Sequence, residues 1–343
     1  MTTGRTLPNL FMRALCVITL LLCASAQAGC LDQTRLRGVN LSGAEFGHDR
    51  LPGVLGKDYT YPSRNDLAYF RDMQMNVIRL PFRWERIQKQ IGGPLDTAEL
   101  AQLRQVVDWA KELNLCVVLD LHNFGTYHGH VLGTSSLPAS AFVDVWLRLH
   151  QAFGNSNDTA FGLMNEPAAM SVPLWMAVAQ QTVLALRSAG AQHLLLVGSG
   201  RWSGAHEFDK EFDGTSAAKA FSNFKDPLNN FAIELHQYAD ADYSGTSKQC
   251  SAAERLGSIM SKVTVWAKQH KKRLFLGEFG VANSPDCLAA LRTLATSMQD
   301  KDAWLGWAYW SAGPWWGDYV LSIQPHNGKE MAQATELRKF LIN

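Results

Sequence analysis

The stretch Cys116-Val117-Val118-Leu119-Asp120-Leu121-His122 combines an apolar run with two polar residues near its C-terminal end. Continuous apolar runs of this length are typical of strands that are buried on both faces, as in parallel sheets. Amphipathic patterns typical of helices flank it, over residues 98–113 and 139–153. The segment therefore predicts a central strand that is connected to, and covered by, surface helices.

The same alternation of apolar and amphipathic segments recurs along the chain. We expect strands at residues 36–42, 77–82, 116–122, 159–165, 193–199, 231–238, 273–279 and 306–311, and helices at 66–75, 98–113, 139–153, 173–189, 217–223, 252–270, 285–298 and 328–341. Eight strand–helix units predict an α/β fold, a closed (β/α)8 TIM barrel in a single domain. The alternative is a doubly wound open sheet, but no Gly-x-Gly-x-x-Gly segment follows the first strand, which argues against a dinucleotide fold.

The N-terminus has the pattern of a secretory signal peptide. Arg5 and Arg13 come before or at the start of an apolar run, residues 14–24, which is too short to span a bilayer because a span needs about 20 residues. Ala26-Gln27-Ala28 then supplies a small-x-small cleavage pattern. We therefore expect residues 1–28 to be a cleaved signal peptide. An uncleaved membrane anchor is the alternative.

Residues 29–343 are expected to form one secreted catalytic domain, because no Pro/Ser/Thr-rich linker interrupts them. The formal net charge of the whole chain is only +1. Such a balance gives no electrostatic reason to expect binding to nucleic acid or to an anionic membrane. A neutral polymer or small molecule is the expected partner, no membrane association is expected after signal removal, and the protein is expected to be a monomer.

Four cysteines lie beyond the signal: Cys30, Cys116, Cys250 and Cys287. Disulfides persist in an exported protein, and four cysteines allow three complete pairings. Cys116 lies inside an apolar run, so we expect it to be a buried free thiol. Lipidation, pairing or a free thiol all remain open for Cys30. No Cys-x-x-Cys or Cys/His spacing indicates zinc.

Polar side chains gather at the predicted C-terminal ends of the strands, which is where barrel enzymes place their active sites. A single buried histidine or arginine is often structural, but so many at one end of the barrel predict one shared pocket. The residues concerned are Asn40, Arg79, Asp120, His122, Asn123, Asn165, Glu166, His236, Tyr238, Glu278 and Trp310.

Glu166 and Glu278 end the fourth and seventh predicted strands. Two carboxyl groups that face each other can hydrolyse a glycosidic bond, one as proton donor and the other as nucleophile. Mutual repulsion and burial can separate their pKa values as this chemistry requires. Gly277 and Gly280 beside Glu278 are expected to leave room for a sugar ring. No His-x-His pair lies on any strand, so we expect no metal and no cofactor.

Eleven tryptophans are many for a chain of this length. Indole rings pack against the flat C–H faces of pyranose rings, and the indole N–H can reach a hydroxyl. We expect the tryptophans in or beside strand ends to bind sugar, namely Trp84, Trp202, Trp310, Trp315 and Trp316.

The chain resembles glycoside hydrolase family 5, in its bacterial and fungal endoglucanase branch. The matching segments are Arg37-Gly38-Val39-Asn40-Leu41-Ser42-Gly43, Asn76-Val77-Ile78-Arg79-Leu80-Pro81-Phe82, Leu121-His122-Asn123, Leu163-Met164-Asn165-Glu166-Pro167, His236-Gln237-Tyr238, Gly277-Glu278-Phe279-Gly280 and Trp310-Ser311. The resemblance runs from about Leu36 to the C-terminus. It implies a TIM barrel that hydrolyses β-glycosidic bonds with retention.

The resemblance also implies a role for each matching position. Glu166 would be the acid/base and Glu278 the nucleophile. Arg79 would support the nucleophile, Tyr238 would donate a hydrogen bond to it, and His236 would contact the acid/base. His122 and Asn165 would bind the sugar before the cut, and Trp310, followed by a cis peptide, would form the platform under the sugar. In the cellulase branch, cysteines at the places of Cys250 and Cys287 pair. The third-strand loop, residues 124–133, matches less closely.

These features predict an endo-β-1,4-glucanase that acts on β-glucan polysaccharide such as cellulose or soluble substituted cellulose. A sister activity of the same family, such as mannanase, xyloglucan hydrolase or exo-glucosidase, is the alternative, and it would use the same two glutamates. A non-catalytic carbohydrate-binding barrel is a further alternative, against which the intact glutamate pair argues.

Overall fold

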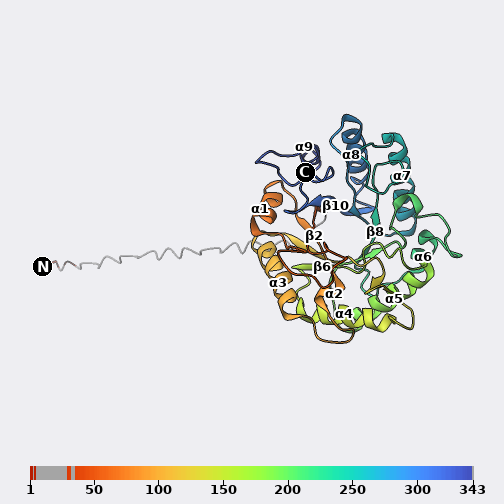
Figure 1. Cartoon of the computed structure of the whole chain (residues 1–343). Helices are drawn as coiled ribbons and strands as arrows, with labels where there is room; N and C mark the ends of the chain where they lie inside the picture. The colour runs from red at the N-terminus through yellow and green to blue at the C-terminus, as the bar shows by residue number, and fades with distance from the viewer. Residues whose placement is uncertain (3, 5–28, 32–34, 342–343) are drawn as a thin grey trace.

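The computed structural model describes residues 1–2, 4, 29–31 and 35–341. The expected signal peptide lies almost wholly outside these residues and stays a prediction. Within them, eight parallel strands form a closed barrel in the order β1-β10-β9-β8-β7-β6-β3-β2 (Figure 1). Their bounds are β1 Leu36–Leu41, β2 Val77–Phe82, β3 Cys116–Leu121, β6 Thr159–Gly162, β7 Leu195–Gly198, β8 Phe231–His236, β9 Leu274–Glu278 and β10 Trp304–Ala312. The (β/α)8 prediction is confirmed.

The helices surround the strands (Figure 1). Several begin where a serine or aspartate side chain accepts a hydrogen bond from the first turn, as Ser63, Asp96, Ser171 and Ser284 do. Their bounds are α1 Arg64–Asp72, α2 Trp84–Ile87, α3 Thr97–Glu112, α4 Ala139–Ala152, α5 Val172–Ser188, α6 Ala217–Asn223, α7 Ala253–His270, α8 Pro285–Ser297 and α9 Ala332–Arg338.

Three short elements were not predicted: α2, the hairpin of β4 (Thr126–Tyr127) and β5 (His130–Val131), and the 3-10 turn η1 (Ala205–Glu207). They belong to the loops above the strand ends, where no periodic pattern announces them. Helix α9 is also shorter than expected, because residues before it form a turn in which His326 and Lys329 pair.

The interior of the barrel changes from apolar to polar along its axis. Because side chains alternate in a strand, every second residue points inward. On β2 the inward series runs from Val77 to Arg79, on β3 from Val118 to Asp120, and on β8 from Ala232 to Glu234 and then to His236. Among the described residues, the lower interior is thus an apolar layer, and the charged side chains that point into the barrel lie toward the C-terminal mouth.

Two disulfides fasten the barrel. Cys250 and Cys287 are bonded, which confirms the pairing that the family resemblance implied. The expectation of a free thiol at Cys116 was wrong, because Cys116 is bonded to Cys30. Cys116 points into the lower apolar layer, and the segment around Cys30 reaches the same layer. The apolar surroundings of Cys116 therefore belong to a disulfide and not to a free thiol.

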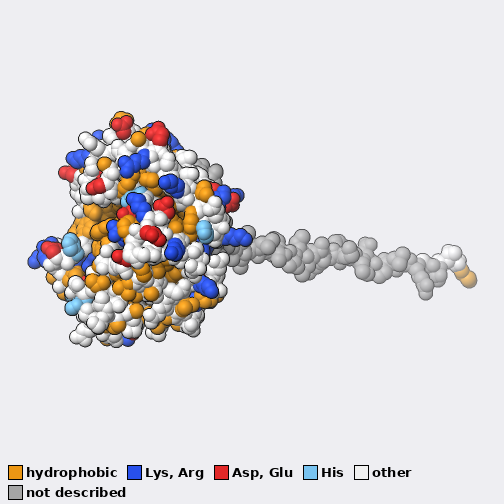
Figure 2. Space-filling view, turned by 90° about the vertical axis from the view of Figure 1, so that its right-hand side faces the viewer, with side chains coloured by type: hydrophobic (Ala, Val, Ile, Leu, Met, Phe, Trp, Pro, Cys, Tyr) orange, Lys and Arg blue, Asp and Glu red, His pale blue; other side chains and the backbone are white. Residues whose placement is uncertain are grey.

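The described surface carries charges of both signs in a mixed distribution, as the face shown in Figure 2 illustrates. Among the described residues, no helix is long and apolar enough to span a membrane.

Candidate active site

Glu166 and Glu278 meet at the mouth of the barrel. Glu278 is the last residue of β9, and Glu166 follows β6 at the same end. A carboxylate oxygen of each and a ring nitrogen of His236 all lie within 4.8 Å of one another. This spacing fits the close pair of retaining glycosidases, about 5–5.5 Å, rather than the wider inverting pair that leaves room for a water molecule.

Arg79 is the centre of the charged layer beneath these carboxyls. Its side chain is completely buried on β2, and each of its three nitrogens contacts an acceptor or anion on another strand. The partners are Asn40 at 2.8 Å, Glu278 at 3.0 Å, Asn165 at 2.7 Å, Asp120 at 3.0 Å and Glu234 at 2.8 Å. Since a guanidinium has a fixed planar shape, these contacts orient the Glu278 carboxylate relative to several strands at once.

Glu278 is held in its ionised form. Burial would raise the pKa of Glu278, but the positive charges of His236 and Arg79 and the hydrogen bond from Tyr238 outweigh it and lower that pKa below its ordinary value. The Tyr238 hydroxyl donates to Oε2 at 2.7 Å, and Arg79 donates to Oε1. A charged carboxylate with both oxygens fixed is what a nucleophile requires.

The pKa of Glu166 is shifted in the opposite direction. Burial raises the pKa of Glu166, the negative charge of Glu278 adds to the rise, and a 2.7 Å contact with His236 Nδ1 opposes it. Its side chain is partly exposed to the cleft. The backbone φ of Glu166 is 39°, a value that non-glycine residues seldom adopt and that recurs at active sites. A carboxyl whose pKa is raised and that faces the cleft suits a general acid.

His236 lies between the two glutamates. Burial would lower its pKa, but the charge of Glu278 and hydrogen bonds to Glu166 and Glu234 raise it to about 10. The ring is therefore an imidazolium at neutral pH, with both nitrogens protonated. Glu166, His236 and Glu278 are close enough to hold a metal ion, but a doubly protonated ring has no lone pair to donate.

A second hydrogen-bond chain fixes the side-chain amide of Asn165. Its Oδ1 accepts from Arg79, so its Nδ2 is the donor toward His122 Nε2 at 3.2 Å. His122 therefore carries its proton on Nδ1, which lies 2.7 Å from Asp120. Burial lowers the pKa of His122 to about 3, which agrees with a neutral ring.

Aromatic side chains lie around the barrel mouth. Trp310 lies over His122 with nearly parallel rings 5.5 Å apart, is followed by the expected cis peptide, and meets Trp316 edge to face at 5.9 Å. Trp202 is 54% exposed and packs its edge near Phe124. Trp315 is also exposed. These tryptophans remain candidates for sugar contacts.

Trp84 and Asn123 do not lie where the sequence predicted. Trp84 is fully buried against Tyr127 and Phe142, so no sugar can stack on it. Asn123 is equally buried, and it accepts from the Trp84 backbone N–H and donates to Glu85. Both residues build the corner between β2 and α2 and are structural.

Two further corrections concern neighbours of the nucleophile. A Cβ at Gly277 would collide with the Glu234 carboxylate, and one at Gly280 with the Trp310 carbonyl oxygen, so these glycines accommodate protein groups rather than a sugar. Glu234 itself was not predicted as a site residue. Its signal was present, because it is a charged residue two positions before His236 in an apolar strand and therefore shares its face.

Fold and site together define a class: a TIM-barrel glycoside hydrolase with a closely spaced carboxyl pair. A sequence model described as "Cellulase (glycosyl hydrolase family 5)" matches residues 35–313. The chain belongs to glycoside hydrolase family 5, which is a retaining family. The family resemblance seen in the sequence is confirmed.

Relatives agree with this placement. The chain is 33% identical over 294 residues to the "Probable endo-beta-1,4-glucanase B" of Aspergillus oryzae, covering 85% of each protein. The solved structure of XacCel5A in complex with cellopentaose is 45% identical with a TM-score of 0.87, covering 89% of this chain and 99% of that one. Pseudomonas stutzeri endoglucanase Cel5A in complex with cellobiose is 34% identical with a TM-score of 0.82, covering 90% and 92%.

Proposed function

We propose that this protein is an endo-β-1,4-glucanase that cleaves internal bonds of cellulose chains with retention, through a covalent glycosyl-enzyme on Glu278. The observation that carries the proposal is the opposed pair of pKa shifts on two carboxyls within 4.8 Å. The cellopentaose and cellobiose held by the two related structures support a β-glucan as substrate.

In the first step Glu166 protonates the departing glycosidic oxygen while Glu278 attacks the anomeric carbon. Forming the ester removes the negative charge of Glu278, which until then raised the pKa of Glu166. Glu166 is now an anion beside the His236 imidazolium, which stabilises the negative charge that the departed proton leaves on the carboxylate. In the second step Glu166 takes a proton from a water molecule, whose oxygen attacks the anomeric carbon. The bond from that carbon to Glu278 breaks, so Glu278 leaves as a carboxylate and Glu166 is protonated again.

Substrate screening tests the proposal. We expect reducing ends to form on substituted cellulose, with little release from mannan, xylan and xyloglucan, and we expect viscosity to fall faster than reducing ends appear. Preferred hydrolysis of mannan or xyloglucan would move the chain to a sister activity of the family. No hydrolysis of any β-glycan would favour the non-catalytic barrel.

We also propose that the protein is exported and acts as a monomer. Two disulfides among the described residues support an oxidising compartment. N-terminal sequencing of the protein recovered outside the cell should begin at Gly29, and sedimentation should give the mass of a single chain. A chain that begins at Met1, or a dimer, contradicts the corresponding part.

A further inference from the structure

Arg86, on α2, reaches from the loop after β2 to the loop between β1 and α1, residues 42–63. Its guanidinium donates hydrogen bonds to four backbone carbonyls of that loop. The acceptors are the carbonyl oxygens of Ala44 at 2.6 Å, Phe46 at 2.5 Å, Gly47 at 3.4 Å and Pro52 at 2.7 Å. Because one rigid planar group holds carbonyls from residue 44 to residue 52, it fixes the shape of this loop at the barrel mouth.

The side chain of Arg86 is buried, and among the described residues it forms no ion pair. Its charge is compensated by the carbonyl oxygens of the loop and by the face of Tyr59, whose ring centre lies 3.8 Å from the guanidinium carbon. A buried charge without partners is costly. The guanidinium and the loop carbonyls therefore hold each other in place.

The same loop carries Phe46 against the aromatic side chains of the mouth. Phe46 meets Trp316 edge to face, with ring centres 4.8 Å apart. Trp316 in turn meets Trp310 at 5.9 Å and stacks on Tyr319 at 4.3 Å. The indole N–H of Trp316 is buried and has no hydrogen-bond partner among the described residues. The orientation of Trp316 therefore depends on packing against its neighbours, and Phe46 is one of them.

We propose that Arg86 is a positioning residue, which acts on the substrate through Phe46 and Trp316. It holds the loop after β1 so that Phe46 keeps the Trp316 ring beside the proposed sugar platform, Trp310. This inference rests on the proposed function. Arg86 does not touch the substrate, because its side chain is buried. Its loss should therefore weaken binding of the glucan and leave the two catalytic carboxyls unchanged.

Arg86→Lys tests the proposal, because a lysine keeps the charge but cannot donate to carbonyls spread along the loop. KM for cellopentaose should rise about two- to tenfold, the effect of weakening one aromatic contact, while kcat stays close to the wild-type value. No rise of KM in Arg86→Lys overturns the proposal.

Arg187→Lys is the matched control. Arg187 is also buried and fixes a loop, through Asp226 and the carbonyl oxygens of Ala191 and Asn230. Its contacts precede β7 and β8 and thus lie at the end of the barrel opposite the mouth. Arg187→Lys should lower the melting temperature and leave KM unchanged. An equal rise of KM in both variants would mean a general loss of stability and overturns the proposal.

A double-mutant cycle tests whether Arg86 acts through Trp316. In the Trp316→Ala background, Arg86→Lys should no longer change KM, because the ring that Arg86 positions is absent. An effect of Arg86→Lys that is equally large with and without Trp316 overturns the proposal.

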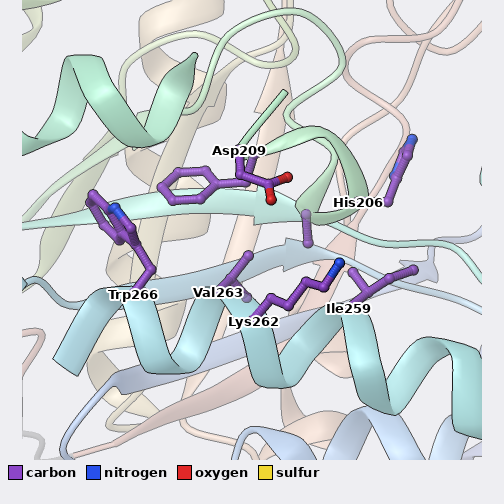
Figure 3. A pocket seen from close by; sticks show the side chains of 8 residues that line it. His206, Asp209, Ile259, Lys262, Val263 and Trp266 are labelled. Carbon is purple, nitrogen blue, oxygen red and sulfur yellow. The ribbon is translucent and has the colours of Figure 1, made fainter. Parts of the chain in front are cut away.

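Near-ultraviolet circular dichroism follows the Trp316 ring without any substrate. Arg86→Lys should change the tryptophan bands, and this change should vanish in the Trp316→Phe background. Trp266→Phe is the control background, because Trp266 is also half-buried and held by aromatic rings but lies in the cavity between η1 and α7 (Figure 3). There the full change should remain.

A spectral change that persists in Trp316→Phe contradicts the link between Arg86 and Trp316. Absence of all β-glucan hydrolysis in the wild type, with the spectral link intact, instead overturns the proposed function. The two failures are therefore distinguishable.

Discussion

Tyr238 and Glu278 are joined by a 2.7 Å hydrogen bond in which the tyrosine hydroxyl donates to Oε2, while Arg79 occupies the other carboxylate oxygen. The Glu278 carboxylate, the proposed nucleophile, is therefore fixed from two sides before any substrate arrives. Tyr238 itself stays protonated, because burial and the charge of Glu278 raise its pKa well above the ordinary value.

Removing the Tyr238 hydroxyl should lower the activity and raise the pKa of Glu278. Tyr238→Phe deletes one of the interactions that lower the pKa of Glu278, so that pKa rises, and the acid limb of the pH–rate profile moves to higher pH. A hydrogen bond to a charged group contributes about 1.5–3 kcal/mol, which corresponds to a loss of about 10- to 100-fold in kcat. Tyr309→Phe is the matched control, because Tyr309 is a buried tyrosine bonded to the Val281 backbone. An unchanged acid limb in Tyr238→Phe contradicts the argument.

Rescue chemistry should distinguish the two glutamates. Glu166→Ala should lose most activity on cellulose, whose leaving group needs a proton, and keep more on an aryl glycoside with a good leaving group. Added azide should accelerate it and give a β-glycosyl azide. Glu278→Ala should fail on both substrates and give at most the α-azide. The reverse pattern in the two variants would mean that their roles are exchanged.

The stereochemistry of hydrolysis follows from the short carboxyl separation. Proton NMR during the first minutes of cello-oligosaccharide hydrolysis should show the β-anomer as the initial product, before mutarotation. An initial α-anomer would falsify the covalent mechanism.

His236 should make stability depend on alkaline pH. Its folded pKa of about 10 lies above the unfolded value of about 6.5, so its proton stabilises the fold fully below pH 6.5, and this contribution is lost as pH rises toward 10. The melting temperature of the wild type should fall more steeply between pH 7 and 10 than that of His236→Gln. In His193→Gln the slope should match the wild type, because burial lowers the pKa of His193 to about 4 and it is neutral throughout this range. Equal slopes in wild type and His236→Gln argue against a protonated His236.

Both disulfides should be found by peptide mapping without reduction. In the chain-entropy model, the Cys250–Cys287 bond, which joins cysteines 37 residues apart, stabilises the fold by about 4 kcal/mol. The Cys30–Cys116 bond, which joins cysteines 86 residues apart, stabilises it by about 4.5 kcal/mol. Replacing Cys250 and Cys287 by alanine should therefore lower the melting temperature by several degrees while the pattern of products stays unchanged. Alkylation of the exported protein at any of the four cysteines contradicts the pairing.

The fold and the meeting of charged residues at the barrel mouth were readable from the sequence because both leave a strong pattern. Apolar strands alternate with amphipathic helices eight times, and charged residues such as Arg79 and Glu278 interrupt otherwise apolar strands. Burying a charge is costly without a partner, so such interruptions indicate that partners converge there.

Side-chain direction in the loops was not readable. Trp84 and Trp202 both follow strand ends, yet one is buried in the wall and the other is exposed over the cleft, because the unpredicted helix α2 turns Trp84 inward. The pairing of Cys30 with Cys116 was hidden for a different reason. It joins residues 86 apart through a barrel floor that exists only in the folded chain.

That floor also sets an order of events during biosynthesis. Cys116 is completely inaccessible in the closed barrel, and Cys30 is almost so. A soluble oxidant or a disulfide exchange catalyst cannot reach either sulfur once the strands have closed around them. We therefore expect the bond to form before the barrel closes, and a chain that folds under reducing conditions would enclose two thiols that oxidise only when the fold opens locally. The oxidation state of Cys30 and Cys116 in each molecule is thus set when its barrel closes.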